Sequence, residues 1–175
     1  MGSSEQTAPQ IEASYTEGLE QLEAHLQGRD YLFGGRPSFG DFGLWGQLYN
    51  AWTDPTAGEL MKQSAPKTVA WVDRMLDPQA TGAWETAEAL LPTLEPLLAR
   101  QVGALFLPWS DANAKAIEAG EEEFECELDG KAWRQKPQKY HARSLKALRA
   151  RYAEVADVTP LAEVLERTGC RTWLL

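Results

Sequence analysis

The stretch GGRPSFGDFGLWGQLYN, from Gly34 to Asn50, decides the fold of this chain. Its five glycines suit either a loop that holds phosphate or a helix packed closely against a neighbour. A phosphate-binding loop requires Gly-Lys-Ser/Thr, and a dinucleotide-binding loop follows a strand. The stretch has neither feature, so it predicts a helix.

Ser38 and Asp41 mark the start of that helix. Serine is a favoured N-cap residue, and an acidic residue three positions later can accept a hydrogen bond from the backbone N–H of the cap. Beyond the cap, Gly40, Gly43 and Gly46 recur at every third position and form a smooth stripe that another helix can approach. The remaining positions are almost all apolar, which predicts a buried helix.

Helical periodicity extends over most of the chain, with apolar residues at steps of three and four. We expect Pro108 to end one helix, and the next helix to be capped by Ser110 or Asp111. The predicted helices cover about residues 10–27, 39–52, 54–63, 66–76, 91–106, 109–120, 137–156 and 159–167.

The segment FECELDGKAWRQ, residues 124–135, carries a β signal. Asp129-Gly130 is a strong two-residue hairpin turn, and folding about it places Cys126 opposite Trp133 and Glu125 opposite Arg134. The sequence therefore predicts an all-α, mainly helical bundle with one small β-hairpin near residues 124–135. Residues 1–9 are expected to form a disordered lead-in, and residues 10–175 a single helical domain.

The charge of the chain argues against polyanionic partners. Its formal net charge of −9 repels nucleic-acid backbones and anionic membranes, so we predict neither partner. An acidic block precedes a basic block, and we expect the two to face each other within the fold or to lie in solvent: Glu118, Glu121, Glu122, Glu123, Glu125 and Glu127, then Lys136, Lys139, Arg143, Lys146, Arg149 and Arg151. The two cysteines and the lack of a long apolar run fit a cytoplasmic protein without a disulfide framework.

Few side chains qualify as metal ligands or nucleophiles. His25, His141, Cys126 and Cys170 lack ligand spacing, so we predict no metal site. Cys126 is expected to be half-buried filler on its strand. Cys170 lies between Arg167 and Arg171, which could lower the pKa of its thiol.

The segment KYHARS, residues 139–144, is the densest group of polar, reactive side chains. His141 shares its predicted helical face with Leu145, which is typical of a core histidine, and Tyr140 points elsewhere. We therefore assign no catalytic residue and keep His141, Tyr140 and Cys170 as candidates only.

The segment LEQLEAHLQGRDYLFGGRPSFGDFGLWGQLYN, residues 19–50, resembles the C-terminal helical domain of the cytosolic glutathione transferase family. In that family a loop of the form Gly-x-x-[Phe/Tyr]-Leu-x-Gly-x-Pro-Ser-x-x-Asp leads from one helix into a buried one. Ser38 and Asp41 match its capping box. The helix near Trp71 fits the same plan, and the chain from Leu91 onward resembles extended bacterial members.

The resemblance also implies what this chain lacks. A complete glutathione transferase begins with a thioredoxin-like domain, which binds glutathione and supplies the Ser, Tyr or Cys that activates its thiol. No strand-helix-strand pattern precedes Gly34, so we expect that domain to be absent. Glutathione is then implied only for the full-length family, with no cofactor bound by this chain alone. The family's acceptor-substrate pocket is lined by aromatic residues of the helical domain, for which the candidates are Trp45, Tyr49, Trp109 and Tyr140.

Three interpretations follow from these residues. In the first, the chain is the helical half of a glutathione transferase-like protein, contributing the apolar acceptor pocket and a homodimer or other oligomer interface, incomplete as a catalyst without a thioredoxin-like partner domain. In the second, it is a stand-alone non-catalytic module that binds an apolar small molecule or a partner protein. In the third, it is a glutathione-independent enzyme that uses His141, Tyr140 or Cys170.

Overall fold

The computed structural model describes residue 5 and residues 7–175. The chain divides into two compact units, Tyr15–Leu94 and the combination of Met1–Ser14 with Glu95–Leu175. The predicted lead-in falls partly on residues 1–4 and 6, which lie outside the described residues, whereas Ala8 and Pro9 already belong to the first helix. The assignment of residues 10–175 to a single domain stays a prediction.

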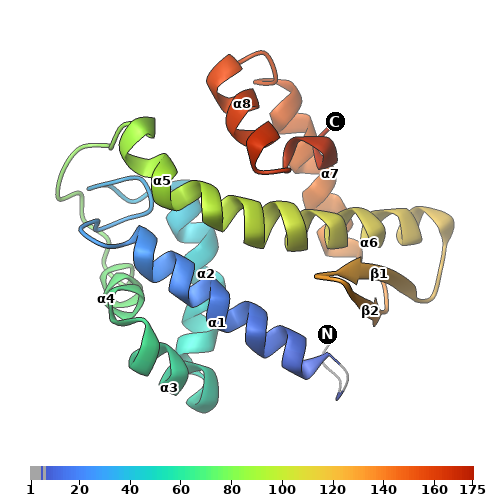
Figure 1. Ribbon diagram of the computed structural model, residues 1–175, viewed down its shortest axis with the longest axis horizontal. Helices are drawn as coiled ribbons and strands as arrows, with labels where there is room; N and C mark the ends of the chain where they lie inside the picture. The colour runs from blue at the N-terminus through green and yellow to red at the C-terminus, as the bar shows by residue number, and fades with distance from the viewer. Residues whose placement is uncertain (1–4, 6) are drawn as a thin grey trace. The chain divides into compact units, whose positions relative to one another are not determined.

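The unit Tyr15–Leu94 is built from helices (Figure 1). The α2 helix packs on both α3 and α4. Asp54 caps α3 by accepting hydrogen bonds of 2.9 Å from the backbone N–H groups of Thr56 and Ala57. Proline lies in the first turn of α3 and of α4, where the backbone N–H that it lacks would have no intrahelical partner. The helices with residues in this unit are α1 (Ala8–His25), α2 (Phe39–Thr53), α3 (Pro55–Ser64), α4 (Pro66–Arg74) and α5 (Ala87–Leu97).

The core of this unit is mainly apolar, and polar groups in and around it join the elements. The carboxylate of Glu23 in α1 accepts hydrogen bonds of 3.0 and 2.9 Å from the backbone N–H groups of Lys67 and Thr68 at the start of α4. Gly34 and Gly35 lie so close to the backbone of residues 82–85 that neither position has room for a Cβ atom. The main buried apolar residues are Leu19, Leu22, Leu26, Tyr31, Met61, Trp71, Val72 and Met75.

His25 is fully buried at the end of α1. Its Nε2 atom lies 2.8 Å from the carbonyl oxygen of Leu32, and its Nδ1 atom lies 2.8 Å from the hydroxyl oxygen of Thr93. Because a carbonyl oxygen can only accept, Nε2 carries the proton, and Nδ1 accepts from Thr93. Burial, the largest influence, lowers the pKa of His25 below its ordinary value and keeps the ring neutral.

We expect His25 to make the free energy of unfolding fall as the pH drops below the ordinary histidine pKa of about 6.5. In that range the unfolded chain takes up a proton that the folded chain, with its lowered pKa, resists, so acid favours unfolding. Urea unfolding between about pH 7.5 and pH 5.5 measures the slope. The variant His25→Gln should flatten this dependence. An equal slope in wild type and His25→Gln would contradict the assignment.

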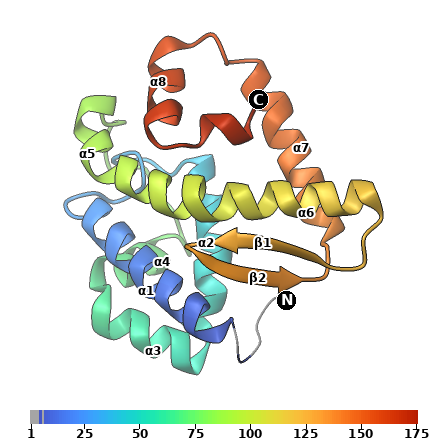
Figure 2. The same ribbon diagram turned by 45° about the vertical axis from the view of Figure 1, so that its right-hand side comes forward.

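The second unit joins a helical layer to a two-stranded sheet (Figure 2). The hairpin packs on α6, and α7 packs on α6 as well. The strands pair in the predicted register, with Cys126 opposite Trp133 and Glu125 opposite Arg134. Asp129 and Gly130 form the turn with φ values of 57° and 70°. The elements after α5 are the π-helix η1 (Leu98–Phe106), α6 (Leu107–Ala119), β1 (Phe124–Leu128), β2 (Lys131–Gln135), α7 (Lys139–Ala153), α8 (Thr159–Arg167) and the short 3₁₀ helix η2 (Arg171–Trp173).

The predicted break at Pro108 is wrong. The chain remains helical from η1 into α6, with Pro108 in the first turn of α6. The N–H of Leu107 bonds to the carbonyl of Val102, five residues earlier. Leu97 and Leu107, which flank η1, both have helical backbone angles. The wider i→i−5 turn of η1 before Pro108 lets the helix continue although proline supplies no backbone N–H. Neither Ser110 nor Asp111 caps this helix, since no helix end falls before them.

The C-terminal segment is held against η1, α6 and α7 by buried contacts. Arg149 of α7 donates to the carboxylate of Asp111 at 2.7 Å and to the carbonyl oxygen of Trp173 at 2.8 Å. Burial raises the pKa of Asp111, but hydrogen bonds from Lys115 and Arg149 outweigh it, so the pKa is lowered overall. The apolar cluster beneath these contacts is formed by Leu107, Leu145, Tyr152, Cys170 and Leu174.

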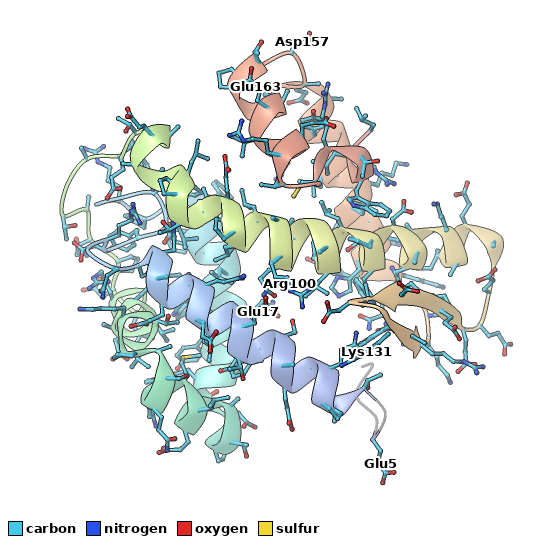
Figure 3. The ribbon with its side chains drawn as sticks, viewed as in Figure 1. Glu5, Glu17, Arg100, Lys131, Asp157 and Glu163 are labelled. Atoms are coloured by element: carbon cyan, nitrogen blue, oxygen red, sulfur yellow. The ribbon has the colours of Figure 1, made fainter. Side chains whose placement is uncertain are left out.

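The hairpin tip is fixed to η1 by an ion pair. Arg100 extends from η1 (Figure 3), and its Nη1 atom lies 2.9 Å from Oδ1 of Asp129 in the turn. The hydrogen bond from Arg100 lowers the pKa of Asp129. With this hairpin in place, the prediction of a mainly helical fold with one β-hairpin over residues 124–135 is confirmed for the described residues.

Candidate functional site

Asp41 is the centre of a buried hydrogen-bond network at the start of α2. It is 0% exposed. Its Oδ1 atom accepts from the backbone N–H of Leu32 at 2.8 Å and from Nε1 of Trp71 at 3.0 Å. Its Oδ2 atom accepts from the backbone N–H of Ser38 at 2.8 Å and from the Ser38 hydroxyl at 2.6 Å, and the Ser38 side chain accepts in turn from the N–H of Asp41. Ser38 and Asp41 thus form the capping box and tie the loop before α2 to α4.

Aromatic side chains form a ladder along one side of α2. The rings of Trp45 and Tyr49 are 5.0 Å apart, and those of Tyr49 and Trp52 are 5.7 Å apart, each pair tilted by 40°. Trp45 donates from Nε1 to the carbonyl oxygen of Val72 at 3.1 Å, which fixes it against α4. The buried Nε1 atom of Trp52 has no hydrogen-bond partner among the described residues. The ladder therefore carries one unused donor.

The prediction that α2 is buried nearly all round is wrong. Phe39 is 95% exposed and Phe42 is 52% exposed, and Asp41 is the buried residue of this helix. Around Gly43 and Gly46 an added Cβ atom would meet nothing within 4 Å. The apolar composition of α2 predicts burial on several sides. Composition alone does not show whether a neighbouring element covers each of those sides. We call the surface formed by Phe39, Phe42, Gly43 and Gly46 the open face of α2.

A second aromatic cluster lies where α6, the hairpin and α7 meet. The amide oxygen of Gln135 accepts from Nε1 of Trp109 at 3.1 Å and from Nε1 of Trp133 at 2.9 Å. The ring of Trp109 lies 5.0 Å from that of His141 at 84°, an edge-to-face contact, and 6.3 Å from that of Phe124. Gln135 is the residue that sequence reasoning missed. The alternation of side chains along β2 places it on the same face as Trp133, but its double acceptor role depends on the position of α6.

The predicted ligand-binding residues divide between these two clusters. Trp45 and Tyr49 belong to the ladder of α2, in one unit, and Trp109 belongs to the cluster around Gln135, in the other. Tyr140 is 76% exposed and contacts that cluster through His141, at a ring distance of 6.0 Å. Of the catalytic candidates, His141 and Tyr140 are therefore neighbours, as their positions on α7 require.

The cysteines are not placed for nucleophilic chemistry. Cys170 is 1% exposed, and burial raises the pKa of its thiol, so the expectation that Arg167 and Arg171 could lower it is wrong. These arginines pair instead with Glu95 and Glu166. Burial also raises the pKa of Cys126, which is half-buried on β1 as predicted.

Across residue 5 and residues 7–175, no group of three or more His, Cys, Asp or Glu side chains is arranged to hold a metal ion. In the same part of the chain, no helix combines the length and the apolar character needed to cross a bilayer.

Comparison with known proteins identifies one part of the chain. Residues 5–74 match the family model described as glutathione S-transferase, C-terminal domain. This segment includes α1 to α4 with the Ser38–Asp41 capping box, the aromatic ladder and the open face of α2. No curated protein and no solved structure matched the chain in the corresponding searches. Residues 5–74 are therefore similar to the C-terminal domain of glutathione S-transferases.

Proposed function

We propose that this chain acts as the helical half of a glutathione transferase-like protein. It supplies the aromatic wall of an apolar acceptor-substrate site and an apolar interface, and it is not catalytically complete alone. The observation that carries the proposal is the arrangement of α2, which lies inside the matched family segment. This helix combines the ladder Trp45–Tyr49–Trp52 with an uncovered apolar surface at Phe39 and Phe42.

The ladder suits an apolar ligand with one polar acceptor. Aromatic side chains contribute large apolar contact areas, and a few polar groups among them set the orientation of a bound molecule. The unpaired Nε1 donor of Trp52 and the hydroxyl of Tyr49 are polar groups of this kind. A buried donor without a partner costs about 1–3 kcal/mol, so a ligand oxygen that accepts from it would bind with a corresponding advantage.

The open face of α2 suits an apolar partner surface. Phe39 and Phe42 expose large side chains, and Gly43 and Gly46 let a second backbone approach closely. Large apolar patches on a protein surface commonly mark interaction sites. In the proposed protein the partner is a thioredoxin-like domain or a second copy of this chain, and the proposed compartment is the cytoplasm.

The reactive side chains support a non-catalytic role for this half. The raised thiol pKa of Cys170 and of Cys126 leaves little thiolate near neutral pH. His141 contacts Trp109 edge-on in an aromatic cluster rather than pairing with a nucleophile. Glutathione activation is therefore assigned to the partner domain, not to this chain.

Calorimetric titration tests the proposal, with glutathione and S-hexylglutathione as separate probes. We expect glutathione alone to give no binding heat. The apolar conjugate should bind in the micromolar to low-millimolar range, about −4 to −8 kcal/mol. Tight binding of glutathione alone would show that the site does not need another domain, and failure of both probes would remove the ligand site from the proposal.

Two matched tyrosine variants locate the ligand. Tyr49→Ala should weaken binding of S-hexylglutathione by about tenfold, because one aromatic contact contributes about 0.5–1.5 kcal/mol beyond its buried area. Tyr140→Ala should leave it unchanged, since Tyr140 is exposed on α7. The reverse pattern would favour the alternative function, a stand-alone module that binds its ligand at the cluster of Trp109, Trp133 and His141.

A further inference from the structure

The outward side of α7 carries several exposed cations. Leu145 and Tyr152 of this helix are buried, and Lys139, Arg143 and Lys146 recur at steps of four and three on the exposed side. Residues three and four apart are neighbours on a helix surface. We call the exposed cations of this region the basic face of α7: Lys136, Lys139, Arg143, Lys146 and Arg151.

The fold leaves these charges uncompensated. Among the described residues, no member of the basic face has an ion pair within 4.0 Å, whereas the inward cation of the same helix, Arg149, pairs with Asp111. Like charges three or four residues apart destabilise a helix by amounts similar to those by which opposite charges stabilise it. The arrangement therefore opposes folding of α7 slightly, and a complementary anionic surface would relieve it.

The same unit carries a surface of the opposite sign. The end of α6, the loop after it and the outward side of β1 present exposed glutamates, of which Glu123 pairs with Arg134. The neighbouring carboxylate of Asp129 is already held by Arg100. We call the exposed glutamates without an ion pair among the described residues the acidic strip: Glu118, Glu121, Glu122, Glu125 and Glu127.

We propose that the basic face of α7 binds the acidic strip of a second copy of this chain, in a twofold-symmetric dimer. Each copy then contributes one surface of each sign, so a single geometry satisfies both contacts, as in an isologous interface. The two surfaces have equal numbers of unpaired charges, as their members show. Complementary charged surfaces fix the orientation of partners and speed their encounter.

A second copy fits the basic face better than a polyanion does. The formal net charge of −9 repels a nucleic-acid backbone or an anionic membrane at long range. A copy of the chain carries the same net charge, but it also carries cations that meet the acidic strip in return. This interface is separate from the open face of α2, and salt distinguishes them, because screening weakens charge pairs and not apolar contacts.

Sedimentation velocity of the purified chain tests the proposal at low and high salt. At about 0.01 M NaCl the Debye length is about 30 Å, and at about 1 M it is about 3 Å. We expect a dimer that forms with rising protein concentration at low salt and a monomer at high salt. A monomer at low salt throughout the concentration range would overturn the proposal.

Charge reversal assigns the contact to these two surfaces. The variants are Lys139→Glu/Lys146→Glu on the basic face and Glu122→Lys/Glu127→Lys on the acidic strip. Each alone should weaken low-salt association by about a hundredfold, since reversal turns several surface attractions into repulsions. An equimolar mixture of the two should restore a dimer, because the mixed dimer keeps one unaltered contact and, in the other, the reversed charges of the two variants are again opposite in sign.

A matched control separates surface contact from net charge. Lys62→Glu/Lys67→Glu changes the net charge equally, at exposed positions of α3 and α4, and should associate as wild type does. Far-UV circular dichroism verifies that each variant is folded. Association that persists at 1 M NaCl and in Lys139→Glu/Lys146→Glu would overturn the proposal and indicate the open face of α2. Binding of a short DNA duplex by a chain that stays monomeric would overturn it in favour of a polyanion.

Discussion

The Asp41→Ala variant is expected to lose about 4 kcal/mol of unfolding free energy, more than the roughly 1 kcal/mol typical of a helix cap. The difference arises because Asp41 accepts four hydrogen bonds while fully buried. Its removal leaves the N–H of Leu32 and Nε1 of Trp71 without partners in the interior, each at a cost of about 1–3 kcal/mol. Urea unfolding followed by tryptophan fluorescence measures the loss.

Asp54→Ala provides the matched control for Asp41→Ala. Asp54 caps α3 through two backbone N–H groups but is exposed, so water can replace its hydrogen bonds. We expect this variant to lose about 1 kcal/mol. Asp41→Asn should fall between the two, since an amide keeps one acceptor oxygen. Equal losses from Asp41→Ala and Asp54→Ala would show that Asp41 acts as a cap and nothing more.

The Gly103→Ala variant is expected to destabilise the C-terminal segment by about 3 kcal/mol, the upper range for overpacking. Gly103 lies in the π-helix η1, and a Cβ atom there would lie closer than 3.0 Å to the backbone carbonyl oxygen of Thr168 and 3.3 Å from Sγ of Cys170. A backbone oxygen cannot rotate away as a side chain can. The segment from Thr168 to Leu174 must therefore shift away from η1, which opens the cluster around Leu107 and Tyr152.

Thermal unfolding and thiol accessibility measure the effect of Gly103→Ala. The midpoint should fall by roughly 10 °C, and Cys170, which is buried in the wild type, should react faster with a thiol reagent. Gly43→Ala is the control, for which we expect a gain in stability instead of a loss. That position is helical with open space around it, so alanine should stabilise the chain by about 0.5–1 kcal/mol. A Gly103→Ala variant as stable and as protected as wild type would refute the close packing of Thr168 on η1.

Capping and turn residues correctly predicted the starts, ends and turns that depend on only a few neighbouring residues. The Ser38–Asp41 box starts α2, and Asp129-Gly130 sets the hairpin register. Gly120 ends α6 with a φ of 71°. In each case the deciding interaction joins residues at most a few positions apart, so a short stretch of sequence contains both partners.

The structure differs from the sequence-based predictions at Pro108 and at Cys170. Pro108 indicated a break, but the i→i−5 bonding of the residues before it lets the helix continue. Arg167 and Arg171 were expected to be able to lower the pKa of the Cys170 thiol, but they pair with Glu95 and Glu166, and the thiol is buried. The aromatic ladder of the candidate site follows from spacing along α2. The double acceptor role of Gln135 instead requires α6 to pack against β2.

The sequence by itself determined the helical class, the capped start of α2 and the hairpin, because periodicity, capping and turn chemistry act over short distances along the chain. Only the tertiary structure decided which apolar residues are covered. Phe39 and Trp71 are both large and apolar, yet one is 95% exposed and the other fully buried. Burial depends on the elements that pack above each position, and those contacts join residues far apart in the sequence.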